Sequence, residues 1–181
     1  SNVTNMCFMF QACGQNSMTS LDLGDKFDTS KVTKMLFMFA HTGRKSMTNL
    51  NLGNKFNTSN VTEMISMFQG CGTNAMTSLD LGEKFDTSNV TNMNYMFQKC
   101  GSKAMTSLDL GDKFYTSKVT DMRHMFEGTG SEAMTVLDLG TGFTKIAEQN
   151  DDMFTNCGTS DLVIYAPELI YSSETSFKLG H

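Results

Sequence analysis

The three histidines are the side chains best suited to acid–base chemistry near neutral pH. They stand at His41, His124 and His181, where they share no common spacing and have no Ser, Cys or Asp partner that would suggest a catalytic triad. The sequence also lacks the H-E-x-x-H, G-x-S-x-G and P-loop strings of metalloproteases, hydrolases and nucleotide-binding enzymes. We therefore predict that the protein is not an enzyme and requires no cofactor.

The five cysteines leave two interpretations open. They are Cys7, Cys13, Cys71, Cys100 and Cys157. The last four are regularly spaced along the chain, and threonine stands at the two remaining positions of this series, Thr42 and Thr129. A small buried residue explains this exchange with threonine. A disulfide between Cys71 and Cys100 is the alternative, and it would persist in an extracellular setting. Because no C-x-x-C string occurs, we predict no zinc site.

Acidic residues and asparagines form three rows with regular spacing. The rows are Asp22, Asn51, Asp80, Asp109 and Asp138; Asp25, Asn54, Glu83, Asp112 and Thr141; and Asp28, Asn57, Asp86, Tyr115 and Thr144. The second member of every row is asparagine. Turns closed by Asp or Asn side chains, with charge balanced by nearby lysines, are one interpretation. Calcium bridged between stacked carboxylates is the other.

The rows reflect a repeat of 29 residues that governs the whole sequence. The pair Met-Phe recurs at Met9, Met38, Met67, Met96, Met125 and Met153, and all 16 methionines fall in three positions of the repeat. A fixed period of this length is typical of stacked repeat architectures. The methionines are therefore expected to form ladders in one continuous core.

Each repeat contains two elements. Residues 18–23 end in the alternating pattern Leu-x-Leu before Gly24, which predicts a short strand. From Val32 to position 42, apolar residues recur at the spacing of one helical face, followed by a glycine at Gly43. We predict an α/β repeat solenoid, right-handed and similar to leucine-rich repeats, with one short parallel strand and one short helix or turn per coil. A flat β-solenoid with two or three strands per coil is the alternative.

The chain divides into two parts on this basis. Residues 1–165 are predicted to form about six solenoid coils, and residues 166–181, which lack the repeat, a capping tail. Because the chain opens inside a repeat, we expect it to be a fragment with a truncated N-terminal end.

The composition excludes several classes of protein. With 39% hydrophobic residues the chain is not intrinsically disordered, and its net charge of −5 argues against nucleic-acid binding. No run of 18 apolar residues is present, so membrane insertion is not expected.

The combined string L-D-L-G-x-K-F-x-T-S-x-V-T-x-M-x-x-M-F-x-x-C-G resembles the BspA-like leucine-rich-repeat surface proteins, over residues 1 to about 165. The resemblance implies an exported or lipid-anchored bacterial protein with a role in adhesion or host contact. It also implies that this domain lies outside the cell or on its surface.

Two surfaces are candidates for binding. Outward positions of the predicted strands form a polar strip, consisting of Ser20, Asp22, Asn49, Asn51, Ser78, Asp80, Ser107, Asp109 and Asp138. On the predicted helix side, the two residues before each Met-Phe change from apolar (Phe8, Leu36, Phe37, Ile65) to basic (Arg123, His124) along the chain. That apolar patch indicates a partner site or contact with further repeats.

We therefore predict a domain for adhesion or recognition. It acts as a monomer and binds a protein or glycan ligand on a host or neighbouring cell, mainly through the polar strip. A purely structural stalk or spacer within a larger surface protein is the alternative.

Overall fold

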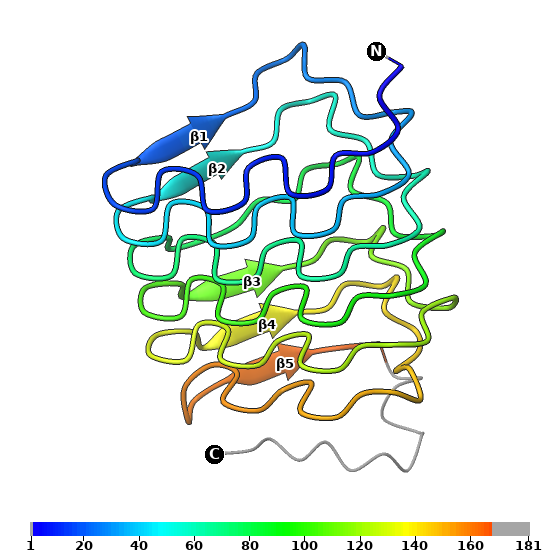
Figure 1. Ribbon diagram of the computed structural model, residues 1–181. Coiled ribbons are helices and arrows are strands. Elements are labelled where there is room, and N and C mark those ends of the chain that lie inside the picture. The colour runs from blue at the N-terminus through cyan, green and yellow to red at the C-terminus, as the bar shows by residue number, and fades with distance from the viewer. Residues whose placement is uncertain (1, 168–181) are drawn as a thin grey trace.

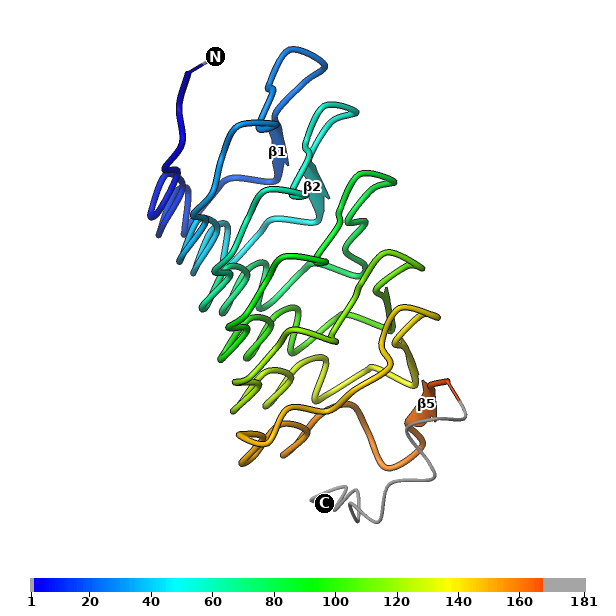
Figure 2. The ribbon, with the colours of Figure 1, turned by 90° about the vertical axis from the view of Figure 1, so that its right-hand side faces the viewer.

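The computed structural model describes residues 2–167. The chain runs in successive coils that lie one on another, with the N-terminal coil at one end of the stack and β5 at the other (Figure 1). We number the coils so that the first contains β1 and each later coil begins 29 residues on, at residues 30, 59, 88 and 117, with the sixth near residue 145. The views in Figures 1 and 2 show the same order of coils from the side and after a quarter turn.

Within residues 2–167, five strands of three residues lie along one side of the stack. They are β1 (Ser20–Asp22), β2 (Asn49–Asn51), β3 (Ser107–Asp109), β4 (Val136–Asp138) and β5 (Val163–Tyr165). All pairs are parallel and in register, so that Leu21 lies opposite Leu50 and Leu108 opposite Leu137. The central leucine of β1, β2 and β3 faces the core, and the two residues that flank it in each strand face outward. The strand prediction from alternation is confirmed at these positions.

The strands form two sheets, β1-β2 and β3-β4-β5. Residues 78–80 of the third coil lie between them in sequence and belong to neither sheet. Their sequence, Ser-Leu-Asp, is identical to that of β1 and β3. The interruption therefore arises from the arrangement of the coils and not from the local sequence.

The predicted α/β solenoid of the leucine-rich-repeat type is wrong, because the described residues contain no helix. The segment expected to be helical is a run of tight turns whose backbone donors alternate in direction. Thr42 N–H donates back to Phe39 O at 3.1 Å, whereas Phe39 N–H donates to Met67 O of the next coil at 2.9 Å. A helix would satisfy these donors within its own segment. Here half of them join neighbouring coils.

The close spacing of the coils explains this outcome. A column of phenylalanine rings runs through the core, at Phe10, Phe39, Phe68, Phe97, Phe126 and Phe154, with successive centroids 5.4 to 5.6 Å apart. Packed helices need about 8–10 Å between their axes, so one helix per coil does not fit at this spacing. The segments of tight turns, such as residues 35–43, are called the turn segments below.

The alternative with two or three strands per coil does not describe the molecule either. Besides the strands, the coils are joined by single-residue parallel bridges at Asn5, Lys34, Glu63, Asn92, Asp121 and Gln149. Each coil thus has one such bridge and at most one strand of three residues.

The core is one continuous cluster of methionine, phenylalanine, leucine and valine. Met38, Met67, Met96 and Met125 are fully buried, whereas their counterpart in the first coil, Met9, is 51% exposed because no coil covers it there. The predicted methionine ladders are therefore core elements. Most of the predicted capping tail, residues 168–181, lies outside the described residues. In the described part of the chain, no helix is long and apolar enough to cross a membrane.

Candidate functional site at the strand ends

The structure brings the predicted polar strip together on one side of the stack. Eight of its nine residues are exposed and Asp138 is half-buried. Strand register places Ser20 opposite Asn49, Asp22 opposite Asn51, and Asp109 opposite Asp138. We call the surface formed by this strip and by the loops after each strand segment, as far as the third row of acidic residues and asparagines, the strand-end face.

The first acidic row closes turns at the ends of the strand segments. Asp80 Oδ1 accepts a hydrogen bond from Gly82 N–H at 2.8 Å, and Asn51 Oδ1 accepts one from Gly53 N–H at 3.0 Å. Asp22, Asp109 and Asp138 do the same with the glycine two residues on. Carboxylate and amide oxygens both accept such bonds, which explains why asparagine can replace aspartate here.

The third row also closes turns, in the loop that follows each Gly-x-Lys segment. Asp28, Asn57 and Asp86 accept hydrogen bonds from the backbone N–H of Ser30, Ser59 and Ser88. Hydrogen bonds from the Ser30 backbone and hydroxyl lower the pKa of Asp28. The turn interpretation of these two rows is therefore confirmed.

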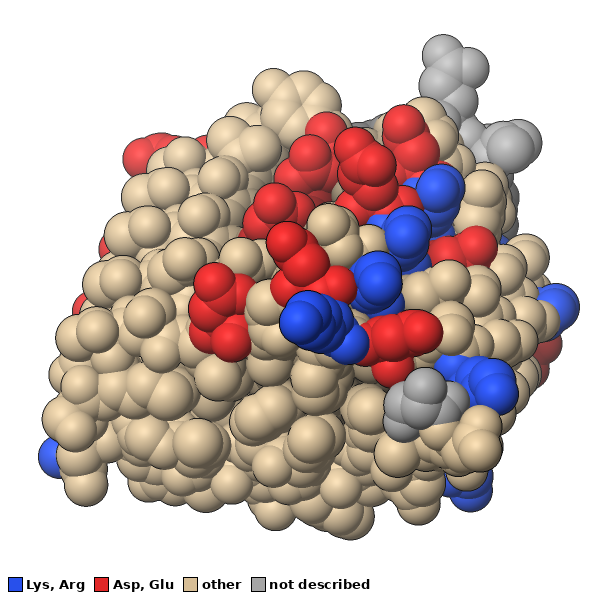
Figure 3. Space-filling model, turned by 90° about the horizontal axis from the view of Figure 1, so that it is seen from above, with Lys and Arg blue, Asp and Glu red and all other residues tan. Residues whose placement is uncertain are grey.

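The strand-end face holds the whole net charge of the protein. Nine carboxylates of the three rows and the lysines Lys26, Lys55, Lys84 and Lys113 lie in the strand ends and loops, which gives this region a net charge of −5. The remaining residues contain ten acidic and ten basic side chains. Seen from above the stack, acidic side chains gather in a band with basic side chains beside it (Figure 3).

Three cavities lie along this face at the ends of the strand segments. Their volumes are about 480 Å³ between the second and third coils, about 440 Å³ between the third and fourth, and about 370 Å³ from the fourth to the sixth. Asp80 lines the first two and Asp109 the last two. The face thus presents a row of depressions that share acidic walls.

The two larger cavities flank the interruption in the sheets. Leu23 N–H donates to Asn51 O at 3.0 Å, and Leu110 N–H donates to Asp138 O at 2.9 Å. Among the described residues, no equivalent backbone bond joins Leu52 to the third coil or Leu81 to the fourth. The third coil therefore approaches its neighbours less closely at the strand ends.

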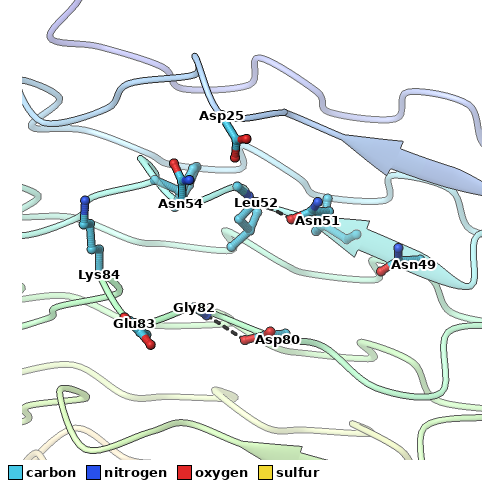
Figure 4. A pocket seen from close by; sticks show the side chains of 12 residues that line it. Asp25, Asn49, Asn51, Leu52, Asn54, Asp80, Gly82, Glu83 and Lys84 are labelled. Atoms are coloured by element: carbon cyan, nitrogen blue, oxygen red, sulfur yellow. Dashed lines mark hydrogen bonds between the residues drawn. The ribbon is translucent and has the colours of Figure 1, made fainter.

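The cavity of about 480 Å³ between the second and third coils is lined by three coils (Figure 4). Its lining residues are Asp25 from the first coil, residues 49–54 and Phe56 from the second, and Asp80, Gly82, Glu83 and Lys84 from the third. Asp25 and Lys84 extend toward the second coil from opposite sides. Carboxylates, amides and one ammonium group surround a floor of Leu50, Leu52 and Phe56, so both hydrogen-bond donors and acceptors converge here.

The structure does not support the metal or disulfide interpretations. Within residues 2–167, no group of three or more His, Cys, Asp or Glu side chains is placed to hold a metal ion. The five cysteines are free, and Cys71, Cys100 and Cys157 are buried. Burial raises the pKa of Cys71 and of Cys157 to about 12. These thiols therefore behave as small core residues.

The turn segments carry a polar cluster, of which the sequence indicates only the basic residues Arg123 and His124. Arg123 donates to both oxygens of the buried Asp121, at 3.0 and 2.8 Å. The Arg123 hydrogen bond is the main cause of a lowered pKa at Asp121. His124 stacks on Tyr95, with ring centroids 4.6 Å apart, and contacts Glu127 at 2.9 Å.

The predicted apolar patch on the turn side is only partly exposed. Phe8 is 53% exposed and stacks on Phe37, with centroids 5.2 Å apart, whereas Leu36, Phe37 and Ile65 are half-buried. The exposed part of this patch is therefore Phe8, in the first coil.

Stacked coils with a constant core and variable outward positions define a repeat protein. The chain belongs to the family described as "Mycoplasma protein of unknown function, DUF285", which matches residues 1–104 and, again, residues 44–163. The two overlapping matches are consistent with a repeated unit. No curated protein and no solved structure matches the chain. The match does not confirm the resemblance to the BspA-like leucine-rich-repeat surface proteins.

Proposed function

We propose that this chain is a non-enzymatic binding module displayed on the cell surface. It recognises a protein or glycan ligand on a host or neighbouring cell through the strand-end face, and it acts as a monomer. The observation that carries this proposal is the row of three cavities along that face. Stacked repeats commonly use such extended surfaces for recognition.

The distribution of sequence variation supports a binding role. The positions of Met38, Phe39 and Leu50 keep almost the same residue type in each coil, because they pack the core. Outward positions of the same coils change, as when Asp22 is followed by Asn51. A constant scaffold with a varied surface allows recognition to change without loss of the fold.

The charge distribution supports the strand-end face as the binding surface. A region with a net charge of −5 attracts and orients partners of complementary charge, while the rest of the described surface has no comparable excess. The resemblance to BspA-like surface proteins supports adhesion and an extracellular location.

Adhesion of coated beads to cultured epithelial cells tests the proposal. The triple variant D22N/D80N/D109N removes three charges but keeps the turn bonds, since Asn51 makes the same bond. We expect it to reduce bead retention by about fivefold or more. The matched control, E132Q/E148Q/D161N, removes three exposed charges outside the face and should leave retention unchanged.

Two results would contradict the proposal. Equal retention of the triple variant and the wild type would remove the strand-end face from consideration. Retention of wild-type beads no greater than that of albumin-coated beads would favour the structural spacer instead.

A further inference from the structure

We propose that the cavity between the second and third coils binds one or two units of a neutral oligosaccharide. This inference rests on the proposed function and gives its ligand a chemical class. The volume of about 480 Å³ is in the range of small-molecule sites and is lined by both polar and apolar groups.

The polar lining matches the hydroxyl groups of a sugar. A hydroxyl both donates and accepts hydrogen bonds, so a polyol needs acceptors and donors in one small site. Asp25, Asp80 and Glu83 supply carboxylate acceptors, and Asn49, Asn51 and Asn54 supply amides that can do either (Figure 4). Asn51 Oδ1 is engaged by Gly53, which orients the amide NH₂ of Asn51 as a donor.

The second coil makes this cavity different from the others on the face. Asn51 and Asn54 stand where the fourth coil has Asp109 and Asp112. The cavity near the end of the stack is lined by Asp109, Asp112 and Asp138 and contains no amide side chain. Each of the two cavities is lined by three carboxylates, but the first also has the Lys84 ammonium, so its formal charge is −2 and not −3. The amides of Asn51 and Asn54 add uncharged hydrogen-bonding groups, which favours a neutral ligand over a cation there.

The interrupted sheet supplies further groups at the same place. Leu52 lines the cavity, and among the described residues its N–H makes no backbone bond to the third coil. Its counterpart Leu23 donates to Asn51 O in the paired sheet. Leu50, Leu52 and Phe56 also line the cavity, and with 2–4% of each residue exposed they offer a small apolar area to the C–H face of a sugar ring.

A peptide ligand fits this cavity less well. Protein interfaces depend on aromatic and arginine anchors in desolvated pockets, and exposed tyrosine, tryptophan or arginine is missing from the cavity lining. The lining instead has many small polar groups around a shallow apolar floor. That arrangement orients a compact polar ligand.

Saturation-transfer NMR on the purified chain tests the proposal. The probes are maltotriose, chitotriose and N-acetyllactosamine at about 5 mM, with spermine and an oligolysine peptide as charged comparisons. We expect at least one neutral sugar to bind. The variant N51D/N54D keeps the turn bond but removes two amides, and should weaken that binding by about tenfold or more.

The control variant is N57D. Asn57 closes a turn with Ser59 in the same coil, and it does not line the cavity. The same chemical change should therefore leave sugar binding unaltered. Loss of binding in N57D as well would show a general effect of charge and would overturn the proposal.

Three further results would each overturn the proposed saccharide site. No binding of any neutral sugar, or equal binding by N51D/N54D, overturns the saccharide site. Binding of spermine or oligolysine that N51D/N54D strengthens identifies a cationic ligand and also overturns it. In each case the bead assay still tests the proposed function separately, because retention of wild-type beads above that of albumin-coated beads requires a ligand on the cells but does not require that ligand to be a neutral sugar. Of the three positions in its triple variant, only Asp80 also lines this cavity.

Discussion

The side-chain carboxylate of Asp80 accepts a hydrogen bond from the backbone N–H of Gly82 over 2.8 Å. The substitution D80A removes this acceptor and should destabilise the protein by about 1 kcal/mol. D80N keeps an acceptor and should change the free energy of unfolding by less than about 0.5 kcal/mol. Urea unfolding monitored by circular dichroism measures both values. Equal destabilisation by the two variants would show that charge, and not the turn bond, is the stabilising feature.

The phenylalanine column is predicted to contribute a large part of the stability. The Phe68 ring lies between Phe39 and Phe97, with centroid distances of 5.4 and 5.6 Å, and is fully buried. F68A should lower the free energy of unfolding by about 3–5 kcal/mol, because it leaves a cavity in the column. F8A is the comparison, since Phe8 is 53% exposed, and it should cost much less. Similar losses for the two variants in thermal unfolding would contradict this account.

The sequence predicted the repeat, the core residues and the strand positions, because these follow from spacing alone. It did not distinguish a helix from a run of turns, since both bury Met35, Met38 and Phe39. The difference lies in the partner of each backbone N–H: about half of these donors bond three residues back, and the others bond a neighbouring coil, most often 28 residues away. Gly70 and Gly128 lie inside the segments expected to be helical, and glycine at such positions disfavours a helix.

The candidate site was predictable only in part. The outward residues of the strand-end face follow from alternation along Leu-x-Leu, and the turn bonds of Asp22 and Asp80 follow from residue type. The cavities and the interruption at residues 78–80 were not predictable, because identical Ser-Leu-Asp sequences are paired in β1 and unpaired in the third coil. They depend on how the coils diverge along the stack.

The turn segments contain strained positions that glycine should relieve. Lys99 has φ of 55°, and glycine occupies the equivalent positions Gly70 and Gly128. An L-residue in this left-handed region costs about 1 kcal/mol, so K99G should raise the free energy of unfolding by roughly 0.5–1 kcal/mol. K103G is the matched control, because Lys103 in the same coil is not among the residues with positive φ, and it should destabilise. A loss of stability in K99G would refute the strain argument.

Burial of His41 should make stability depend on pH. Desolvation, followed by the charge of Arg44, lowers the pKa of His41 below its model-compound value of 6.5. The unfolded chain therefore binds a proton at His41 more readily than the folded chain does. The contribution of His41 to the free energy of unfolding is complete above about pH 6.5, and it is lost as the pH falls toward the lowered pKa. Urea unfolding at about pH 7.5 and 5.5 should show a smaller decrease for H41N than for the wild type.

Asparagine is a suitable replacement at this position. His41 has φ of 58°, and Asn156 occupies the equivalent position with φ of 55°. H41N should therefore retain the fold. If the free energy of unfolding falls by the same amount in H41N and in the wild type between the two pH values, His41 does not cause the acid sensitivity.

Backbone chemical-shift mapping tests the central claim, that the strand-end face between the second and third coils is the ligand site. The ¹⁵N-labelled chain is titrated with the neutral sugar that gives the strongest saturation-transfer signal. We predict that the shifted amides cluster in residues 49–54 and 80–84, which line the cavity of about 480 Å³. Shifts confined to the turn segments, around Tyr95 and His124, would contradict the account.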